Sequence, residues 1–453
     1  MSESIPQPGV SAIESARIGA GSGSSLRTLV LHPYAKSPQK DRDSRTAEDR
    51  LEEAVGLARA IDLDVVEAIC LPVDTPKPGA YLGKGKLEDI AGKVAEAGAG
   101  LVVFDGALSP VQQRNLEGAL AAKVIDRTGL ILEIFGERAR TKEGELQVEL
   151  AHLNYQRSRL VRSWTHLERQ RGGYGFMGGP GERQIETDRR IIGDRIAQIR
   201  RELDGVRKTR QIHRRRRQRA GLPVIALVGY TNAGKSTLFN RLTAAEVTAR
   251  DMLFATLDPT MRAIALPGGR RAILSDTVGF ISGLPTHLVA AFRATLEEVL
   301  AADIVIHVRD ASHPESEAQA ADVYATLADL GLDREDAEAP PVIEALNKID
   351  LMSKEARERL TNRAARCERA VPISAATGEG LAALESEIAL LLGANDAVVE
   401  LDLGPEEGAR LAWLYDNGEV LERDVDDEGR MHLAVRLDPV ACAQLEKART
   451  REV

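Results

Sequence analysis

The chain has 453 residues, of which 43% are hydrophobic and 28% charged, and its formal net charge is −9. At about 100–200 residues per domain, these values predict a soluble globular protein with several domains. The three cysteines, Cys70, Cys367 and Cys442, are far apart and lack metal-ligand spacing, which argues against a disulfide framework or a zinc site. No uncharged apolar run of about 18 residues occurs, so we expect no transmembrane segment. We expect a monomer in the cytoplasm, with partial membrane association as an alternative.

Residues 1–24 are rich in serine, glycine and proline and lack the apolar centre of a signal peptide, which predicts a disordered tail. Residues 25–138 then alternate between short apolar runs and helical patterns. The runs at 26–32, 63–70, 100–104 and 123–126 predict strands, and the patterns at 45–61, 87–97 and 109–122 predict helices. Alternation of this kind predicts a small α/β subdomain with a parallel sheet.

Residues 139–220 change character and predict an antiparallel helical hairpin. Apolar side chains recur there at intervals of three, four or seven, which is the spacing of a coiled-coil seam. The first run is Leu146, Leu150, Leu153, Leu160, Trp164 and Leu167, and the second is Ile185, Ile192, Ile196, Ile199, Leu203 and Val206. The joining loop, residues 171–182, contains six glycines and exceeds the roughly 2–5 residues of a plain hairpin turn. It is either a flexible hinge or, as we favour, a finger that approaches a partner surface closely.

The hairpin region is also strongly basic. Residues 138–220 carry 22 Lys and Arg against 10 Asp and Glu, whereas the rest of the chain has a net charge of −21. This contrast favours RNA or another polyanion as a partner, with a solvated Arg-rich helical surface as the alternative.

Residues 221–394 predict a GTPase domain. An apolar strand at 223–228 is followed at once by G-x-x-x-x-G-K-S and a helical pattern, which is the context of a phosphate-binding loop. Glycines let backbone N–H groups surround phosphates at a helix N-terminus, Lys235 reaches the outer phosphates, and Ser236 ligates Mg²⁺. The nucleotide-binding residues expected here are Gly229, Tyr230, Thr231, Asn232, Ala233, Gly234, Lys235, Ser236 and Thr237.

A second motif, D-x-x-G, follows the apolar run at 272–274. Asp276 can hold magnesium through water. The Gly279 N–H can hydrogen-bond to the γ-phosphate, so its contacts differ between the GTP and GDP states. Switch loops also need a threonine that completes magnesium coordination in the GTP state, and we choose Thr256 over its competitor Thr260. The candidate catalytic residues are therefore Lys235, Thr256 and Gly279, and the candidate metal ligands are Ser236, Thr256 and Asp276.

Two further motifs select the base. Asn347, Lys348 and Asp350 form N-K-x-D after an apolar strand at 341–346. The Asp350 carboxylate can accept two hydrogen bonds from guanine that adenine does not offer. Ser374 and Ala375 follow a strand at 370–373 and can supply a backbone N–H to the guanine O6. These four motifs predict GTP as substrate and GDP as product.

Phe280 and Asn232 bear on hydrolysis. Phe280 stands where Ras-type GTPases place the glutamine that orients the attacking water. A phenyl ring cannot orient water, so unaided hydrolysis should be slow, and another group or a partner must complete the site. Asn232 either helps to hold a K⁺ ion near the phosphates or only stabilises the loop, and the sequence leaves both readings open.

Residues 395–453 predict a small α+β C-terminal domain. Strand patterns occur at 398–403, 419–423 and 431–437, and helical patterns at 405–414 and 439–449. At about 55 residues the domain lies near the lower size limit for independent stability, so we expect contacts with the neighbouring domain to stabilise it.

Over nearly all its length after the tail, the chain resembles HflX-type GTPases. The resemblance lies at residues 81–86, 108–117, 126–128, 145–153, 171–190, 254–260 and 276–280. It implies a multidomain α/β protein whose partner is the large ribosomal subunit and its rRNA, and which splits or rescues stalled or idle ribosomes under stress. It implies too that the loop at 171–182 points toward ribosomal RNA. The family is also associated with ATP use by the N-terminal domain. In this sequence the only feature that supports an ATP site is the short basic turn Gly83, Lys84, Gly85 and Lys86.

Three functions stay open at this point. The leading one is a ribosome-associated GTPase. The first alternative is a GTPase that acts on another RNA, or that unwinds RNA with ATP. The second is a regulatory GTPase with a protein or membrane-associated partner, in which the hairpin is a coiled-coil contact.

Overall fold

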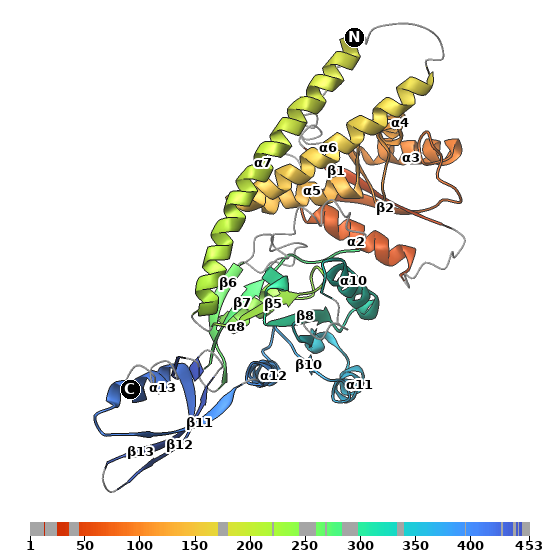
Figure 1. Ribbon diagram of the computed structural model, residues 1–453. Helices are drawn as coiled ribbons and strands as arrows, with labels where there is room; N and C mark the ends of the chain where they lie inside the picture. The colour runs from red at the N-terminus through yellow and green to blue at the C-terminus, as the bar shows by residue number, and fades with distance from the viewer. Residues whose placement is uncertain are drawn as a thin grey trace. The chain divides into compact units, whose positions relative to one another are not determined.

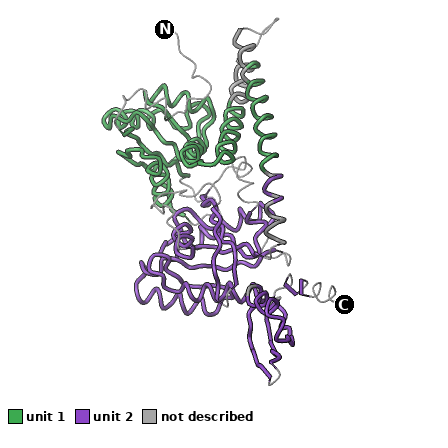
Figure 2. Tube along the Cα trace, turned by 90° about the vertical axis from the view of Figure 1, so that its left-hand side faces the viewer, with its two compact units in different colours: residues 1–206, 251–258, 283–293 green, residues 207–250, 259–282, 294–453 purple. Residues whose placement is uncertain are grey.

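The computed structural model describes most of the chain (Figure 1). The described residues are 13, 25–35, 45–170, 180–219, 222–243, 260–267, 270–282, 298–332, 339–394, 396–426, 429–437, 441–442 and 444–445. Apart from residue 13, the expected tail lies outside them. The chain divides into two compact units, shown in Figure 2. One comprises residues 1–206, 251–258 and 283–293, and the other comprises residues 207–250, 259–282 and 294–453.

The first unit contains a four-stranded parallel sheet, which confirms the prediction from the alternating pattern. Its strands are β1 (Arg27–Tyr34), β2 (Asp64–Pro72), β3 (Leu101–Phe104) and β4 (Lys123–Asp126), in the order β2-β1-β3-β4. Helices α2 (Ala47–Arg59), α3 (Lys84–Ala97) and α4 (Pro110–Leu120) form the predicted connections. Leu29, Val102 and Phe104 of the sheet share a buried cluster with Leu116 of α4. Burial on both faces explains why these strands are continuous apolar runs.

Helix α5 (Arg127–Arg138) was not among the predicted elements of this unit. Its N-terminus is capped by Asp126, whose side chain accepts a hydrogen bond of 2.8 Å from the Gly129 N–H. Leu130, Ile131, Leu132, Ile134 and Phe135 are all buried. A helix covered on several sides has no single apolar stripe, so its sequence lacks a clear helical period.

Two long helices follow, α6 (Lys142–Gln170) and α7 (Pro180–Arg219), and run in opposite directions beside each other in Figures 1 and 2. Leu146 of α6 and Ile192, Ile196 and Ile199 of α7 are buried, as the apolar spacing predicts. Arg195 of α7 binds Glu149 of α6 through two hydrogen bonds of 2.6 and 2.8 Å.

One boundary of the hairpin differs from the prediction. The glycine-rich loop was expected to end at Glu182, but α7 begins at Pro180. Proline has a fixed φ suited to the first turn of a helix and lacks the N–H that would be unpaired there, which explains the earlier start. Residues 171–179, the rest of the expected loop, lie outside the described part of the chain.

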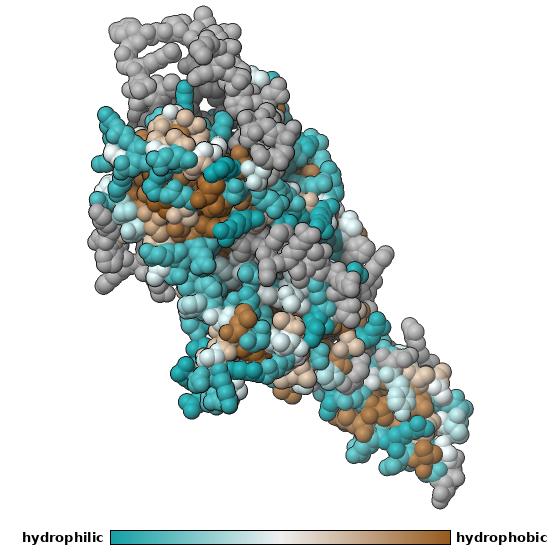
Figure 3. Space-filling view, turned by 180° about the vertical axis from the view of Figure 1, so that it is seen from behind, coloured by the Kyte–Doolittle hydropathy of each residue, from teal (hydrophilic) through white to brown (hydrophobic). Residues whose placement is uncertain are grey.

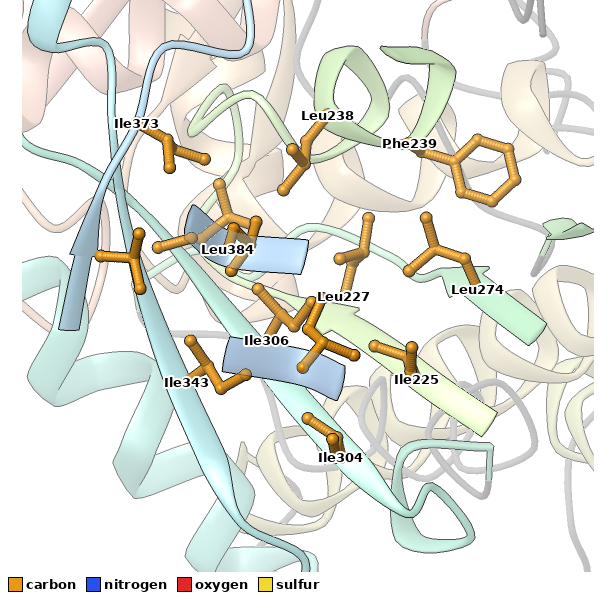
Figure 4. Close-up of a cluster of buried hydrophobic side chains, with 14 of the residues drawn as sticks. Ile225, Leu227, Leu238, Phe239, Leu274, Ile304, Ile306, Ile343, Ile373 and Leu384 are labelled. Atoms are coloured by element: carbon orange, nitrogen blue, oxygen red, sulfur yellow. The ribbon is translucent and has the colours of Figure 1, made fainter. Parts of the chain in front are cut away.

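The second unit contains a six-stranded sheet that carries the nucleotide motifs. Its order is β10-β9-β8-β5-β7-β6, and only β6 is antiparallel to its neighbour. The strands are β5 (Val224–Val228), β6 (Thr260–Ala265), β7 (Arg271–Asp276), β8 (Ile304–Asp310), β9 (Val342–Asn347) and β10 (Ala370–Pro372). The helices are α8 (Lys235–Thr243), α10 (Ser316–Asp329), α11 (Lys354–Ala364) and α12 (Leu381–Leu392), with a short 3₁₀ helix η2 (Ile349–Leu351). Figure 4 shows Leu238 and Phe239 of α8 and Leu384 of α12 beside aliphatic side chains from four strands.

The second unit ends in the predicted small α+β part, whose three strands form an antiparallel sheet. Strands β11 (Ala397–Leu403), β12 (Gly418–Val425) and β13 (Met431–Leu437) lie in the order β11-β13-β12, with helix α13 (Gly408–Asn417). Leu401, Leu433 and Leu414 form its small core. An ion pair of 2.6 Å joins Asp396, just before β11, to Arg270 beside the six-stranded sheet.

The described surface is mixed in character. On the face drawn in Figure 3, hydrophobic residues form patches within a largely hydrophilic surface. Among the described residues, no helix combines the length and the hydrophobicity needed to cross a membrane.

Candidate nucleotide-binding site

The phosphate-binding loop connects the buried central strand β5 to helix α8. Gly229 follows the last residue of β5, and Lys235 opens α8, so the loop has the predicted strand–loop–helix context. Gly234 adopts a φ of +96°, and a Cβ atom there would overlap the side-chain amide of Asn347. Both the backbone angle and the space therefore require glycine at this position.

The ammonium group of Lys235 is held inside this loop. The residue is only 6% exposed, and its Nζ donates to the carbonyls of Gly229 at 3.0 Å and Tyr230 at 2.8 Å. Burial lowers the pKa of Lys235 to about 8, and the negative charge of Asp276 opposes that shift. An incoming phosphate would add a second negative charge to that of Asp276 and so favour the charged form of the lysine.

Ser236 and Asp276 form the part of the site that fits a magnesium ion. The Ser236 hydroxyl donates a hydrogen bond of 2.8 Å to Asp276 Oδ2, which places a hydroxyl and a buried carboxylate side by side. Oxygen donors of this kind suit Mg²⁺, which usually takes only one or two protein ligands besides phosphates and water. The chosen switch threonine, Thr256, lies outside the described residues. Its competitor Thr260 is the first residue of β6 and pairs with Asp276 across the sheet.

The D-x-x-G segment lies directly against the phosphate-binding loop. A Cβ atom on Gly279 would come within 2.9 Å of the Thr231 side chain and 3.1 Å of Lys235 Nζ, so glycine is needed for this approach. The next residue, Phe280, is 4% exposed. Its N–H donates to the Gly229 carbonyl at 3.1 Å, and its carbonyl accepts from the Thr231 N–H at 2.8 Å. The Phe280 ring is therefore buried in the protein, in keeping with the expectation that it cannot orient water.

On the base side, Asn347 links two loops. Its Nδ2 donates to the Ala233 carbonyl at 2.8 Å, and its Oδ1 accepts from the Ala375 N–H at 2.9 Å. Lys348 has a φ of +65°, and its ammonium pairs with Asp310 at 2.7 Å. Asp350, in η2, is exposed and thus open to a base.

The structure adds detail to three other expected residues. The Ala375 N–H donates to Asn347 and the Ser374 N–H donates to the Glu379 carbonyl, so contact of either with guanine O6 stays a prediction. Asn232 is exposed with a φ of +60°, a conformation that asparagine tolerates well. The loop conformation alone therefore accounts for an asparagine at this position. A role of Asn232 in binding K⁺ stays a prediction. Thr237 lies in the first turn of α8.

One residue of the site, Asp310, and the bridging role of the predicted Asn347 were not expected from the sequence. Asp310, at the end of β8, carries no motif of its own and is found only through its ion pair with Lys348. The bridging role of Asn347 between the two loops likewise depends on side-chain geometry that spacing does not reveal. The Gly83–Lys86 turn, on which ATP binding rested, forms the start of α3, where Lys86 donates to the Pro72 carbonyl. This arrangement adds no support for an ATP site.

The motif residues on β5, β7, β9 and β10 all lie at the carboxyl ends of parallel strands and so meet at one edge of the sheet. A phosphate-binding loop with a buried lysine, a Ser–Asp pair beside it and an N-K-x-D motif define a P-loop GTPase that binds GTP. Comparison with known proteins narrows this class. The chain belongs to the HflX family of GTPases.

Four family models match in chain order. They are the GTP-binding GTPase N-terminal model at residues 48–136, the GTP-binding GTPase middle region at 138–217, the 50S ribosome-binding GTPase at 224–348 and the HflX C-terminal domain at 359–451. GTPase HflX of Magnetococcus marinus is 48% identical over 94% of this chain and 96% of its own length. GTPase HflX of Escherichia coli is 43% identical over 93% of this chain and 96% of its own length. A crystal structure of a GTP-binding protein from Sulfolobus solfataricus in complex with GDP is 25% identical, covers 81% of this chain and 98% of its own, and has a TM-score of 0.44.

Proposed function

We propose that this protein hydrolyses GTP on the large ribosomal subunit and uses the cycle to split or rescue stalled or idle ribosomes. The observation that carries this proposal is a set of GTP-binding motifs at one edge of the sheet in which the buried Phe280 follows Gly279, where Ras-type GTPases place a water-orienting glutamine. A site of that kind needs another group or a partner to orient the attacking water. Membership of the HflX family, and the match of residues 224–348 to a model described as a 50S ribosome-binding GTPase, support the ribosome as that partner.

The residues of the site have distinct tasks in this proposal. Lys235 neutralises the outer phosphates, and the Gly279 N–H responds to the γ-phosphate. Ser236 and Asp276, with the switch threonine, would hold a magnesium ion, which neutralises the charge that develops on the phosphates when it is bound. Asp350 selects guanine. We propose a cytoplasmic location, where both GTP and ribosomes are found.

The basic hairpin supplies the surface for RNA. Arg189, Arg190, Arg200, Arg201 and Lys208 of α7 are exposed, and residues 138–220 as a whole have 12 more basic than acidic side chains. Each contact with an RNA phosphate releases counterions, so binding should weaken steeply as salt is raised.

A charge-reversal experiment tests this surface. The double variant Arg200→Glu with Arg201→Glu should lower the affinity for purified large subunits, measured by co-sedimentation, at least tenfold. The affinity should also depend less steeply on salt concentration, while GTP turnover of the free protein stays unchanged. Lys84→Glu is a charge-reversal control outside the hairpin, because its side chain is 92% exposed on α3. If the double variant binds large subunits as the wild type does, the hairpin is not the RNA surface. If it instead loses binding to a different RNA only, the alternative RNA partner is correct.

A further inference from the structure

Thr231, the third residue of the phosphate-binding loop, has a buried hydroxyl group. The residue is 7% exposed, and its Oγ1 has no hydrogen-bond partner among the described residues. Buried hydroxyl groups are nearly always hydrogen-bonded in folded proteins. A hydroxyl left without a partner beside a ligand site therefore points to a group that arrives with the ligand.

The surroundings of this side chain identify which end of the nucleotide it faces. A Cβ atom built on Gly279 would lie 2.9 Å from Thr231 Cγ2 and 3.1 Å from Lys235 Nζ. Gly279 and Lys235 are the two groups that the motifs assign to the γ-phosphate and the outer phosphates. The Thr231 side chain thus lies beside the two groups assigned to the terminal phosphates, with its methyl group against Gly279.

The backbone holds Thr231 in this place. The Thr231 N–H donates to the Phe280 carbonyl at 2.8 Å, and the Phe280 N–H donates to the Gly229 carbonyl at 3.1 Å. The Ser282 N–H also donates to the Tyr230 hydroxyl at 2.8 Å. Three hydrogen bonds therefore join the loop to the residues that follow the D-x-x-G motif, and they hold the Thr231 backbone beside Gly279.

We propose that the Thr231 hydroxyl hydrogen-bonds at the γ-phosphate end of GTP, to the phosphoryl group or to the water that attacks it. A hydroxyl can accept a hydrogen bond from water while donating one to a phosphoryl oxygen. It thereby supplies part of the polar contact that the Phe280 ring cannot make. The proposal concerns the nucleotide site alone and does not depend on the ribosomal role.

Two substitutions separate the hydroxyl from the methyl group of Thr231. Thr231→Val keeps the methyl and removes the hydroxyl, whereas Thr231→Ser does the reverse. Single-turnover GTP hydrolysis without ribosomes, the Kd of a non-hydrolysable GTP analogue and the Kd of GDP are measured for each. We expect T231V to lower the hydrolysis rate or the analogue affinity about tenfold or more, with the Kd of GDP within about twofold of wild type, and T231S to stay close to wild type.

Other outcomes overturn the proposal. Wild-type hydrolysis and analogue affinity in T231V would mean that the hydroxyl makes no such contact. A loss in T231S alone would show that contact of the methyl group with Gly279, not hydrogen bonding, matters at this position, and equal losses in both variants would show that the hydroxyl has no separate role. A loss of GDP affinity in T231V equal to its loss of analogue affinity would show a general disturbance of the loop. Because every readout uses the free protein, failure of ribosomes to stimulate the wild type would refute the proposed function and leave this comparison unaffected.

Discussion

Replacing Asn347 by alanine removes both hydrogen bonds that join the phosphate-binding loop to the base-side loop. Asn347 is 2% exposed, and its two backbone partners belong to Ala233 and Ala375, which are 1% and 3% exposed. The substitution leaves a carbonyl and an N–H buried without a partner, each at a cost of about 1–3 kcal/mol. We therefore expect N347A to lower the free energy of unfolding of this unit by about 2–6 kcal/mol, a large share of the roughly 5–15 kcal/mol of a typical domain.

Native-state hydrogen exchange of the β5 and β9 amides measures this loss in the unit that contains the site. Asn115→Ala is the matched control, because the Asn115 Nδ2 donates to the Gly79 carbonyl at 2.7 Å in an exposed setting where water can replace it. The control should change the opening free energy of its own surroundings by less than about 0.5 kcal/mol. A change of no more than about 0.5 kcal/mol in the opening free energy of the β5 and β9 amides of N347A would contradict a structural role for the two hydrogen bonds.

The remaining predictions concern nucleotide binding and turnover. Asp350→Asn should weaken GDP binding at least tenfold and improve binding of xanthosine diphosphate, because the amide can no longer accept both guanine hydrogen bonds; an unchanged ratio of the two Kd values would argue against this base contact. Lys235→Ala and Ser236→Ala should each abolish measurable GTP turnover, and wild-type rates in either would refute the assignment of the phosphate and metal groups. Because the pKa of Lys235 is lowered to about 8 in the free protein and phosphates restore the charged form, nucleotide binding should take up close to one proton at pH 9 and almost none at pH 7, with affinity falling as the pH rises above 8. Calorimetry in two buffers of different ionisation enthalpy measures this uptake, and buffer-independent heats at pH 9 would contradict it.

The sequence predicted the parts of the fold whose patterns are local. The buried run before Gly229 and the glycine–lysine loop after it identify β5, the phosphate-binding loop and α8 together, because each needs the next. The four parallel strands of the first unit were predicted for the same reason, since apolar runs alternate with capped helices. Ser109, for instance, caps α4 by accepting a hydrogen bond from the Gln112 N–H at 3.2 Å, which matches the helix start expected at that residue.

What the sequence did not predict depends on tertiary surroundings. Helix α5 was missed because its consecutive apolar residues are buried on several sides and lack a helical period. The antiparallel strand β6 was missed because only its pairing with β7 defines it, and most of its residues are not buried. In the site, the Asn347 bridge, the Lys348–Asp310 pair and the Thr231 hydroxyl, which has no hydrogen-bond partner within the described ranges, all depend on distances between segments far apart in the chain.

The most direct test of the central claim is the rate of GTP turnover with and without purified large ribosomal subunits, in potassium buffer. We expect slow turnover by the free protein, because Phe280 is buried and cannot orient water, and a stimulation of tenfold or more by large subunits. Demonstrated GTP binding without any stimulation would contradict the ribosomal role, and the activator would then have to be another RNA or a protein.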